Sequence, residues 1–246
     1  MLWVRSKAVE AYLGETLVGC VGLDGLDARW VRVPDAHAGL AQLREWSEGA
    51  GHPVRARIWL GSSLSRPLML GADCGARTAQ EAAELALAIA GDSTGLSGDL
   101  KVWTSPWRDG CPTLAVATRK DVLATLQSAK RKGWHVSSVR PWWNQVIDPV
   151  LNRSRAQART IGWSLAEPDG LVRGRVDAGQ VMEAGYETSK ARDPDWTLLR
   201  RRLAIGWGKV DEVEHFGFEP TPPAGGRSVL FGIGHAALTT VTEAIK

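Results

Sequence analysis

Cysteine is scarce in this sequence, and the few thiols are scattered. The chain of 246 residues has three cysteines, Cys20, Cys74 and Cys111, with no C-x-x-C pair and no histidine at metal-ligand spacing. An odd, dispersed set excludes a disulfide framework and gives no zinc signature. We therefore expect reduced, buried thiols and no metal site.

Long apolar runs are also missing. No segment approaches the roughly 18 apolar residues that a membrane-spanning helix needs, and residues 1–15 lack the continuous apolar stretch of a signal peptide. Charge of one sign is not in excess either, since 30 lysines and arginines stand against 27 aspartates and glutamates. These absences predict a cytoplasmic globular protein, for which a nucleic-acid partner is permitted but not required.

Tyrosine and phenylalanine are few, at two and three residues, whereas tryptophan occurs 12 times. Most of the tryptophans fall in the first 143 residues, many of them within strand-like segments. Each indole buries a large apolar area and needs one partner for its N–H. This set therefore favours packing in a rigid core over an exposed binding surface.

Two adjacent tryptophans, Trp142 and Trp143, close the segment SVRPWW. Pro141 suits the first turn of a helix, and Pro149 should kink or end that helix. We expect Trp142 to point toward the other half of the chain. Trp143 should share one helix face with three apolar side chains, Val146, Ile147 and Val150.

The first part of the chain alternates strands with helices. Hydrophobic periodicity predicts three strands, a helix and a strand at 3–13, 16–21, 29–33, 36–48 and 54–60. A second group follows, with strands at 67–70, 101–104, 113–118 and 135–139, and helices at 78–90 and 121–132. The capping box Thr78-Ala-Gln-Glu81 opens the first of these two helices.

The last part repeats the opening order. After a polar, basic connection at 152–159, we predict strands at 161–165, 171–176 and 181–187, a helix at 194–206, and strands at 212–218 and 228–233. The βββαβ order therefore occurs twice. The sequence predicts an α/β protein with mixed sheets, built from two related halves at residues 1–152 and 153–246.

Two such halves facing each other are the plan of the actin-like ATPase fold, which has a ribonuclease H-like architecture. Within that superfamily the chain resembles the cytoplasmic actin-like domains of type II secretion L proteins and PilM-type pilus assembly proteins. Three segments carry the resemblance over nearly the whole chain: IWLGSSLSRPLML at 58–70, TLAVATRKDVLATL at 113–126 and SVRPWW at 138–143.

The resemblance implies ATP and Mg²⁺ as cofactors, held by phosphate loops. Nucleotide-binding members have an aspartate in the first hairpin, but here Tyr12 to Thr16 has none. Asp177 and Gly179 fit a second phosphate turn, and Gly225-Gly226 or the run at 231–236 fits an adenosine loop. Without the first loop, hydrolysis should be weak or lost. We therefore expect a degenerate ATPase.

The same resemblance implies a scaffold in a type IV pilus or type II secretion assembly. Its partners would be inner-membrane assembly proteins, with a homodimer as a further option. The protein would be cytoplasmic, attached peripherally to the inner membrane through such a partner. We expect Arg140, Trp142 and Trp143 to form either a docking surface or the contact between the two halves.

Two other functions remain open at this point. Nucleic-acid binding could use tryptophan stacking and two basic groups, Arg153, Arg155 and Arg159 or Arg200 to Arg202. A hydrolase of unrecognised class would need a nucleophile and a base, yet the sequence has no G-x-S-x-G elbow and its five histidines lie in unrelated contexts.

Overall fold

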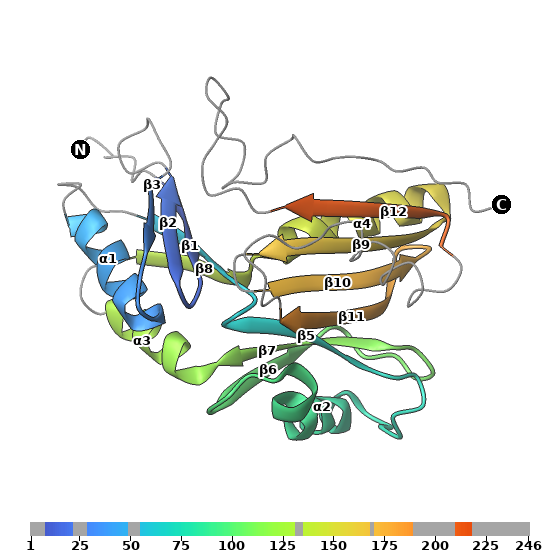
Figure 1. The fold of residues 1–246 in the computed structure, drawn as a ribbon. Helices are drawn as coiled ribbons and strands as arrows, with labels where there is room; N and C mark the ends of the chain where they lie inside the picture. The colour runs from blue at the N-terminus through green and yellow to red at the C-terminus, as the bar shows by residue number, and fades with distance from the viewer. Residues whose placement is uncertain are drawn as a thin grey trace, which may run out of the picture.

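A five-stranded mixed sheet organises the first half (Figure 1). The computed structural model describes residues 8–21, 29–48, 55–130, 135–167, 170–188 and 210–217. The strands follow the order β3-β2-β1-β4-β8. The first three strands pair antiparallel, and β4 is parallel to both β1 and β8. Their bounds are β1 (Ala8–Leu13), β2 (Leu17–Val21), β3 (Arg29–Arg32), β4 (Arg55–Leu60) and β8 (His135–Pro141).

Helices α1 (Ala36–Glu48) and α3 (Lys120–Lys130) pack against this sheet and against each other. The buried residues of α1 recur every three or four positions, at Ala36, Gly39, Leu40 and Leu43, which places them on one face. The helix bounds at 36–48 agree with those predicted from the periodicity.

The second half has a four-stranded sheet with the same order of strands. Strand β9 (Thr160–Glu167) pairs antiparallel with β10 (Gly170–Asp177), which pairs antiparallel with β11 (Gln180–Thr188). Strand β12 (Glu212–Gly217) lies parallel to β9. The order β11-β10-β9-β12 therefore repeats β3-β2-β1-β4. The predicted helix at 194–206 and the strand at 228–233 lie outside the described residues.

Between β4 and α3 the chain forms a separate layer that the sequence did not predict as a unit. Strands β5 (Ser65–Leu70), β7 (Thr113–Arg119) and β6 (Leu100–Thr104) make an antiparallel sheet, and α2 (Ala79–Thr94) packs on it through Ala82, Ala86 and Ala90. Its edge strand β5 lies beside β11 of the second half (Figure 1). We call residues 65–119 the insertion.

The capping box of α2 is confirmed in part. Thr78 Oγ1 accepts a hydrogen bond from the Glu81 amide at 3.1 Å, as expected of an N-cap. Glu81 reaches back one residue further than predicted, and its carboxylate accepts from the Arg77 amide. Gly95, at φ 66°, ends the helix in the left-handed conformation that glycine tolerates.

Helix α4 (Asn144–Gln157) packs on β9 and β10 of the second sheet. Trp143, Val146, Ile147 and Val150 are all buried, which confirms the predicted apolar face. The predicted start is wrong, because Pro141 is the last residue of β8. The proposed division between residues 152 and 153 falls within α4.

Pro149 does not end this helix, which continues for two further turns. Proline inside a helix costs about 3 kcal/mol. Burying a valine or isoleucine side chain stabilises by about 1.5–3 kcal/mol, and three such side chains on α4 are buried. Packing on the second sheet therefore outweighs the missing hydrogen bond.

The cysteines only partly meet the expectation. Cys20 is buried on β2, whereas Cys74 and Cys111 are partly exposed, in loops of the insertion. Cys74 and Cys111 are free thiols. Within the described residues no helix is long and apolar enough to cross a membrane.

A partly buried ion pair ties α4 to the outer strand of the second sheet. Arg153 lies 2.9 Å from Glu214 and 3.8 Å from Glu212 on β12. The Glu214 side chain is 1% exposed. Burial raises the pKa of Glu214, and the attraction to Arg153 opposes this only in part. Arg153 thus helps to pack α4 on the second sheet. We therefore do not count it in the predicted basic group of Arg153, Arg155 and Arg159.

The substitution Glu214→Gln tests this balance through pH. Because the folded pKa is raised, the native protein loses stability as pH rises from the ordinary glutamate pKa through the raised value. Glutamine does not titrate, so the unfolding free energy of the variant minus that of the native chain should increase over this window. Urea titrations at a series of pH values measure the difference. Glu45→Gln, at an exposed position of α1, is the control. A difference that is constant or falls with pH would contradict the assignment.

Candidate functional site

The shared strand order pairs each turn of one half with a turn of the other. The β1–β2 turn, residues 14–16, corresponds to the β9–β10 connection, and the β2–β3 connection corresponds to the turn between β10 and β11. Asp177 is the last residue of β10 and Gly179 lies in that last turn, at the opposite end of β10 from Gly170. By this matching, the partner of the first hairpin is the connection that follows Glu167.

Glu167 brings a buried carboxylate to the first half. Its Oε2 accepts a hydrogen bond of 2.7 Å from the Ser62 amide and lies 3.3 Å from the Tyr12 hydroxyl, which donates to it. Ser62 belongs to the turn between β4 and β5, and Tyr12 to β1. A buried carboxylate needs such donors because leaving water is costly for a charge. These three residues, which we call the Glu167 junction, join the halves.

Glycine is required beside this junction. A Cβ atom at Gly61 would lie 2.3 Å from the Tyr12 hydroxyl oxygen and 3.3 Å from Glu167 Oε2. No real Cβ contact is as short as the first distance, so any side chain here would displace the tyrosine. Tyr12 is itself fixed, since its ring meets the edge of Trp142 with centroids 5.8 Å apart.

The first hairpin is closed by hydrogen bonds within the protein. The Gly14 amide donates to the Leu17 carbonyl, and the Glu15 amide donates to Ser63 Oγ, each at 2.9 Å. The Glu15 side chain, the acidic group of this hairpin, pairs with Arg119 at 2.7 Å. The Gly14 and Glu15 amides, which could otherwise donate to an anion, are thus already used within the protein.

Arg119 is held between two carboxylates. It donates to Glu15 and, through two nitrogens, to Asp121. The hydrogen bond from Arg119 is the main cause that lowers the pKa of Asp121, and the bond to Asp121 is the main cause that raises the pKa of Arg119. The hairpin therefore faces a cation that is already neutralised.

A second contact joins the insertion to the second half. Arg66 is buried and donates to the carbonyls of Ser62 and Thr94, at 2.8 and 2.7 Å. Its guanidinium carbon lies 3.7 Å from the centroid of the Tyr186 ring on β11, a cation–π contact. Together with the Glu167 junction, this contact fixes the turn between β4 and β5 from both sides.

The tryptophans of SVRPWW lie in the core. Trp142 and Trp143 are both 0% exposed, and the Trp143 indole donates to the Ser65 carbonyl at 3.3 Å. Trp142 contacts Tyr12 at the Glu167 junction. Of the two roles expected for these rings, a docking surface or the contact between the halves, we propose the contact between the halves.

Arg140, by contrast, is exposed and lines a cavity of about 290 Å³ between the first sheet and the insertion. The other walls include Leu60, Val139 and the exposed ring of Trp103. We call this space the docking groove. Arg140 and Trp103 reach it from β8 and β6, which meet only in the folded chain.

The predicted cofactor residues are spread over different places. The Asp177 side chain is exposed and accepts from Thr160 Oγ1 at 2.9 Å, and the Gly179 amide donates to Ser154 Oγ. Gly225 and Gly226 lie outside the described residues. Among the residues that the structure describes, no group of three His, Cys, Asp or Glu side chains could hold a metal ion.

Comparison with solved structures gives the fold. A Bacteroides thetaiotaomicron protein described as having an actin-like ATPase fold and unknown function matches with a TM-score of 0.59 at 13% identity, over 89% of this chain and 86% of that one. The cytoplasmic domain of EpsL, an inner membrane component of the type II secretion system of Vibrio cholerae, matches with a TM-score of 0.51 at 15% identity, over 88% and 84%. A PilM–PilN type IV pilus biogenesis complex matches with a TM-score of 0.48 at 13% identity, over 82% and 66%.

No protein-family model and no curated protein matches the sequence. The chain nevertheless has the actin-like ATPase fold, with two α/β halves of the same strand order. The resemblance stated from SVRPWW and the two longer segments is confirmed at the level of the fold.

Replacing Glu167 by alanine should destabilise the whole chain. A hydrogen bond to a charged group contributes about 1.5–3 kcal/mol, so we expect a loss of that size in the free energy of unfolding, measured by urea titration. Glu45→Ala on α1 is the control, with an expected change near zero. Tyr12→Phe combined with Glu167→Ala should cost less than the sum of the single changes, because the two side chains share one hydrogen bond. A Glu167→Ala chain as stable as the control would contradict the junction.

Proposed function

We propose that this chain is an actin-like scaffold domain of a bacterial type II secretion or type IV pilus assembly, without fast nucleotide hydrolysis. The observation that carries the proposal is the closed first hairpin. Its Gly14 and Glu15 amides donate within the protein, and its acidic side chain pairs with Arg119. Binding of a nucleotide phosphate there would require breaking these bonds.

The Glu167 junction supports the same proposal. An anion already occupies the Ser62 amide in the turn between β4 and β5, and it comes from the opposite half. A phosphate in this position would meet a buried carboxylate, and like charges at close range repel strongly in a low-dielectric interior. The two halves are thus stabilised against each other without a ligand.

A scaffold needs a surface for its partner, and we place that surface at the docking groove. Trp103 is 44% exposed beside Arg140, and the walls are mostly apolar. Aromatic and arginine side chains are enriched where binding energy concentrates in protein interfaces. The EpsL cytoplasmic domain, which shares the fold, belongs to an inner membrane component. We propose a partner of that kind and a cytoplasmic location held by it.

The closed hairpin makes a prediction about ATP. Titration with a fluorescent ATP analogue, with and without Mg²⁺, should give no saturable binding up to millimolar nucleotide. Phosphate release should not exceed that of buffer. Saturable, Mg²⁺-dependent binding would contradict the closed hairpin, and turnover of about 1 s⁻¹ or faster, the range of ordinary enzymes, would overturn the proposal.

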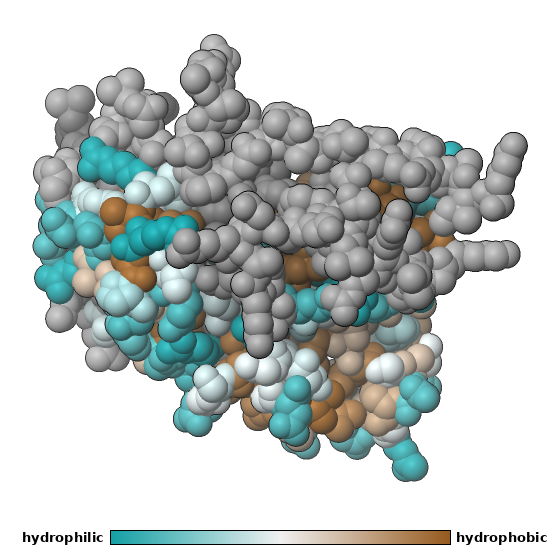
Figure 2. All heavy atoms as spheres, viewed as in Figure 1, coloured by the Kyte–Doolittle hydropathy of each residue, from teal (hydrophilic) through white to brown (hydrophobic). Residues whose placement is uncertain are grey.

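The docking groove makes a prediction about contact with a partner. A photo-crosslinking amino acid in place of Trp103, in the native host, should form an adduct with an inner-membrane component of the assembly. The matched control is Leu87, which is 51% exposed on α2 and lies outside the groove. Figure 2 shows apolar residues on the surface of the insertion, so the Leu87 control also measures nonspecific crosslinking. Equal adducts at both positions, or none at Trp103, would contradict the groove.

A further inference from the structure

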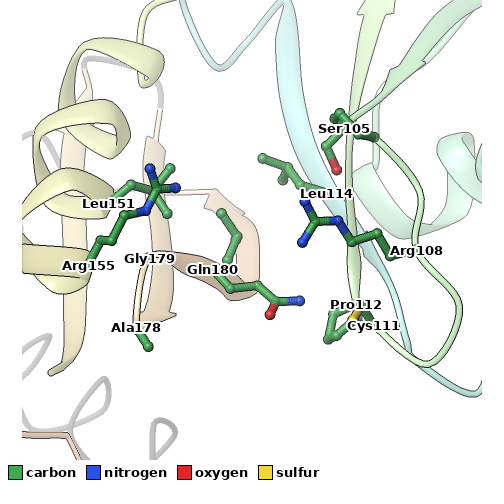
Figure 3. A pocket seen from close by; sticks show the side chains of 12 residues that line it. Ser105, Arg108, Cys111, Pro112, Leu114, Leu151, Arg155, Ala178, Gly179 and Gln180 are labelled. Carbon is green, nitrogen blue, oxygen red and sulfur yellow. The ribbon is translucent and has the colours of Figure 1, made fainter. Parts of the chain in front are cut away.

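A second cavity, of about 450 Å³, lies between α4, the turn joining β10 to β11 and the loop between β6 and β7 (Figure 3). Its volume is in the range typical of small-ligand sites. It lies at the other end of β10 from the connection after Glu167. Since β10 has eight residues, each rising about 3.3 Å, the cavity is well separated from the Glu167 junction.

Two arginines and a glutamine, from three different elements, are among the residues that line this cavity. Arg155 comes from α4, Gln180 from the start of β11 and Arg108 from the β6–β7 loop. Arg108 and Gln180 extend into the gap from opposite sides, with Arg155 beside Leu151 on the α4 side (Figure 3). Leu114 and Leu151 supply apolar wall between them. We call this space the arginine cavity.

The positive charge of the cavity is not neutralised within the part of the chain that the structure describes. No aspartate or glutamate is among the described residues that line it. Neither Arg108 nor Arg155 has a described acidic partner within ion-pair distance, unlike Arg119, Arg153 and Arg173. The neighbouring Asp177 accepts a hydrogen bond from Thr160 instead.

The Arg155 side chain passes close to the turn between β10 and β11 at Gly179. Gly179 has φ 81°, and a Cβ atom there would lie 2.7 Å from both Cβ and Nε of Arg155. The buried Ser154 hydroxyl accepts from the Gly179 amide at 3.1 Å and donates to the Arg159 carbonyl at 2.6 Å, so the turn is fastened to the end of α4. A cation in the last turn of a helix also suits the helix dipole. The helix dipole accounts for a basic residue at position 155. The missing side chain at Gly179 leaves the space through which the Arg155 side chain runs along the cavity wall.

We propose that the arginine cavity binds a small organic phosphate. Two guanidinium groups match the two negative charges of a phosphate monoester, and their planar forks suit its oxygens. The Gln180 amide can donate a further hydrogen bond. The walls formed by Leu114 and Leu151 suit an apolar body attached to the phosphate, which inorganic phosphate lacks.

The test uses phenyl phosphate, inorganic phosphate and phenol as probes of the full chain, without nucleotide. Binding is followed by isothermal titration calorimetry and by the amide chemical shifts of Gly179 and Gln180. Phenyl phosphate should saturate and shift both amides. Inorganic phosphate should bind more weakly, and phenol should not bind. Equal affinity for the two phosphates would overturn the role of the apolar walls.

Variants assign the binding to the two arginines. Arg108→Gln and Arg155→Gln should each weaken phenyl phosphate binding about tenfold to a hundredfold, the usual effect of losing a hydrogen bond to a charged group. Arg44→Gln, at an exposed position of α1, should leave the affinity unchanged. Thermal unfolding of each variant shows that it is folded, and both cavity arginines are exposed enough to be replaced.

Gly179→Ala gives an independent check, because it moves Arg155 without removing it. It should weaken binding by a similar factor, and Arg108→Lys should retain part of the affinity that Arg108→Gln loses. Binding unchanged in both arginine variants would overturn the proposal. The same holds if phenyl phosphate causes no shift of the Gly179 and Gln180 amides at millimolar concentration.

Discussion

A buried carboxylate joins the two halves of this molecule at the turn between β4 and β5. Glu167 ends β9, and its donors, the Ser62 amide and the Tyr12 hydroxyl, both belong to the first half. Taking a charge out of water is costly unless such donors are present, so the second sheet is stable in this position only while the turn between β4 and β5 keeps its shape. The missing side chain at Gly61 and the ring of Trp142 maintain that shape.

The polar groups around the Glu167 junction are occupied by contacts within the protein, whereas two cavities elsewhere are open to solvent. Around the Glu167 junction, the amides of the first hairpin and the carboxylate of Glu15 are used within the protein. The docking groove opens beside the insertion, and the arginine cavity opens at the far end of β10. If the proposed partner and ligand bind at these openings, walls that keep their shape would lower the entropy lost on binding.

Much of the local structure could be predicted because it depends on neighbours in the sequence. The bounds of α1, the N-cap at Thr78 and the apolar face of α4 follow from helical spacing and capping. The start of α4 could not, since Pro141 fits the end of an edge strand as well as the first turn of a helix. Glu167 looked like an ordinary turn residue, because nothing near it in the sequence indicates its donors 105 and 155 positions away.

The sequence by itself determined the repeated order of strands and the α/β class, since side-chain periodicity and turn residues act over a few positions. Only the tertiary structure decided which turns of the two halves correspond, that Trp142 and Trp143 are buried while Arg140 is exposed, and that Arg108 and Arg155 line one cavity. These outcomes depend on how the second sheet and the insertion pack against the first sheet. Contacts of that kind join distant positions, and they leave no period in a single sequence.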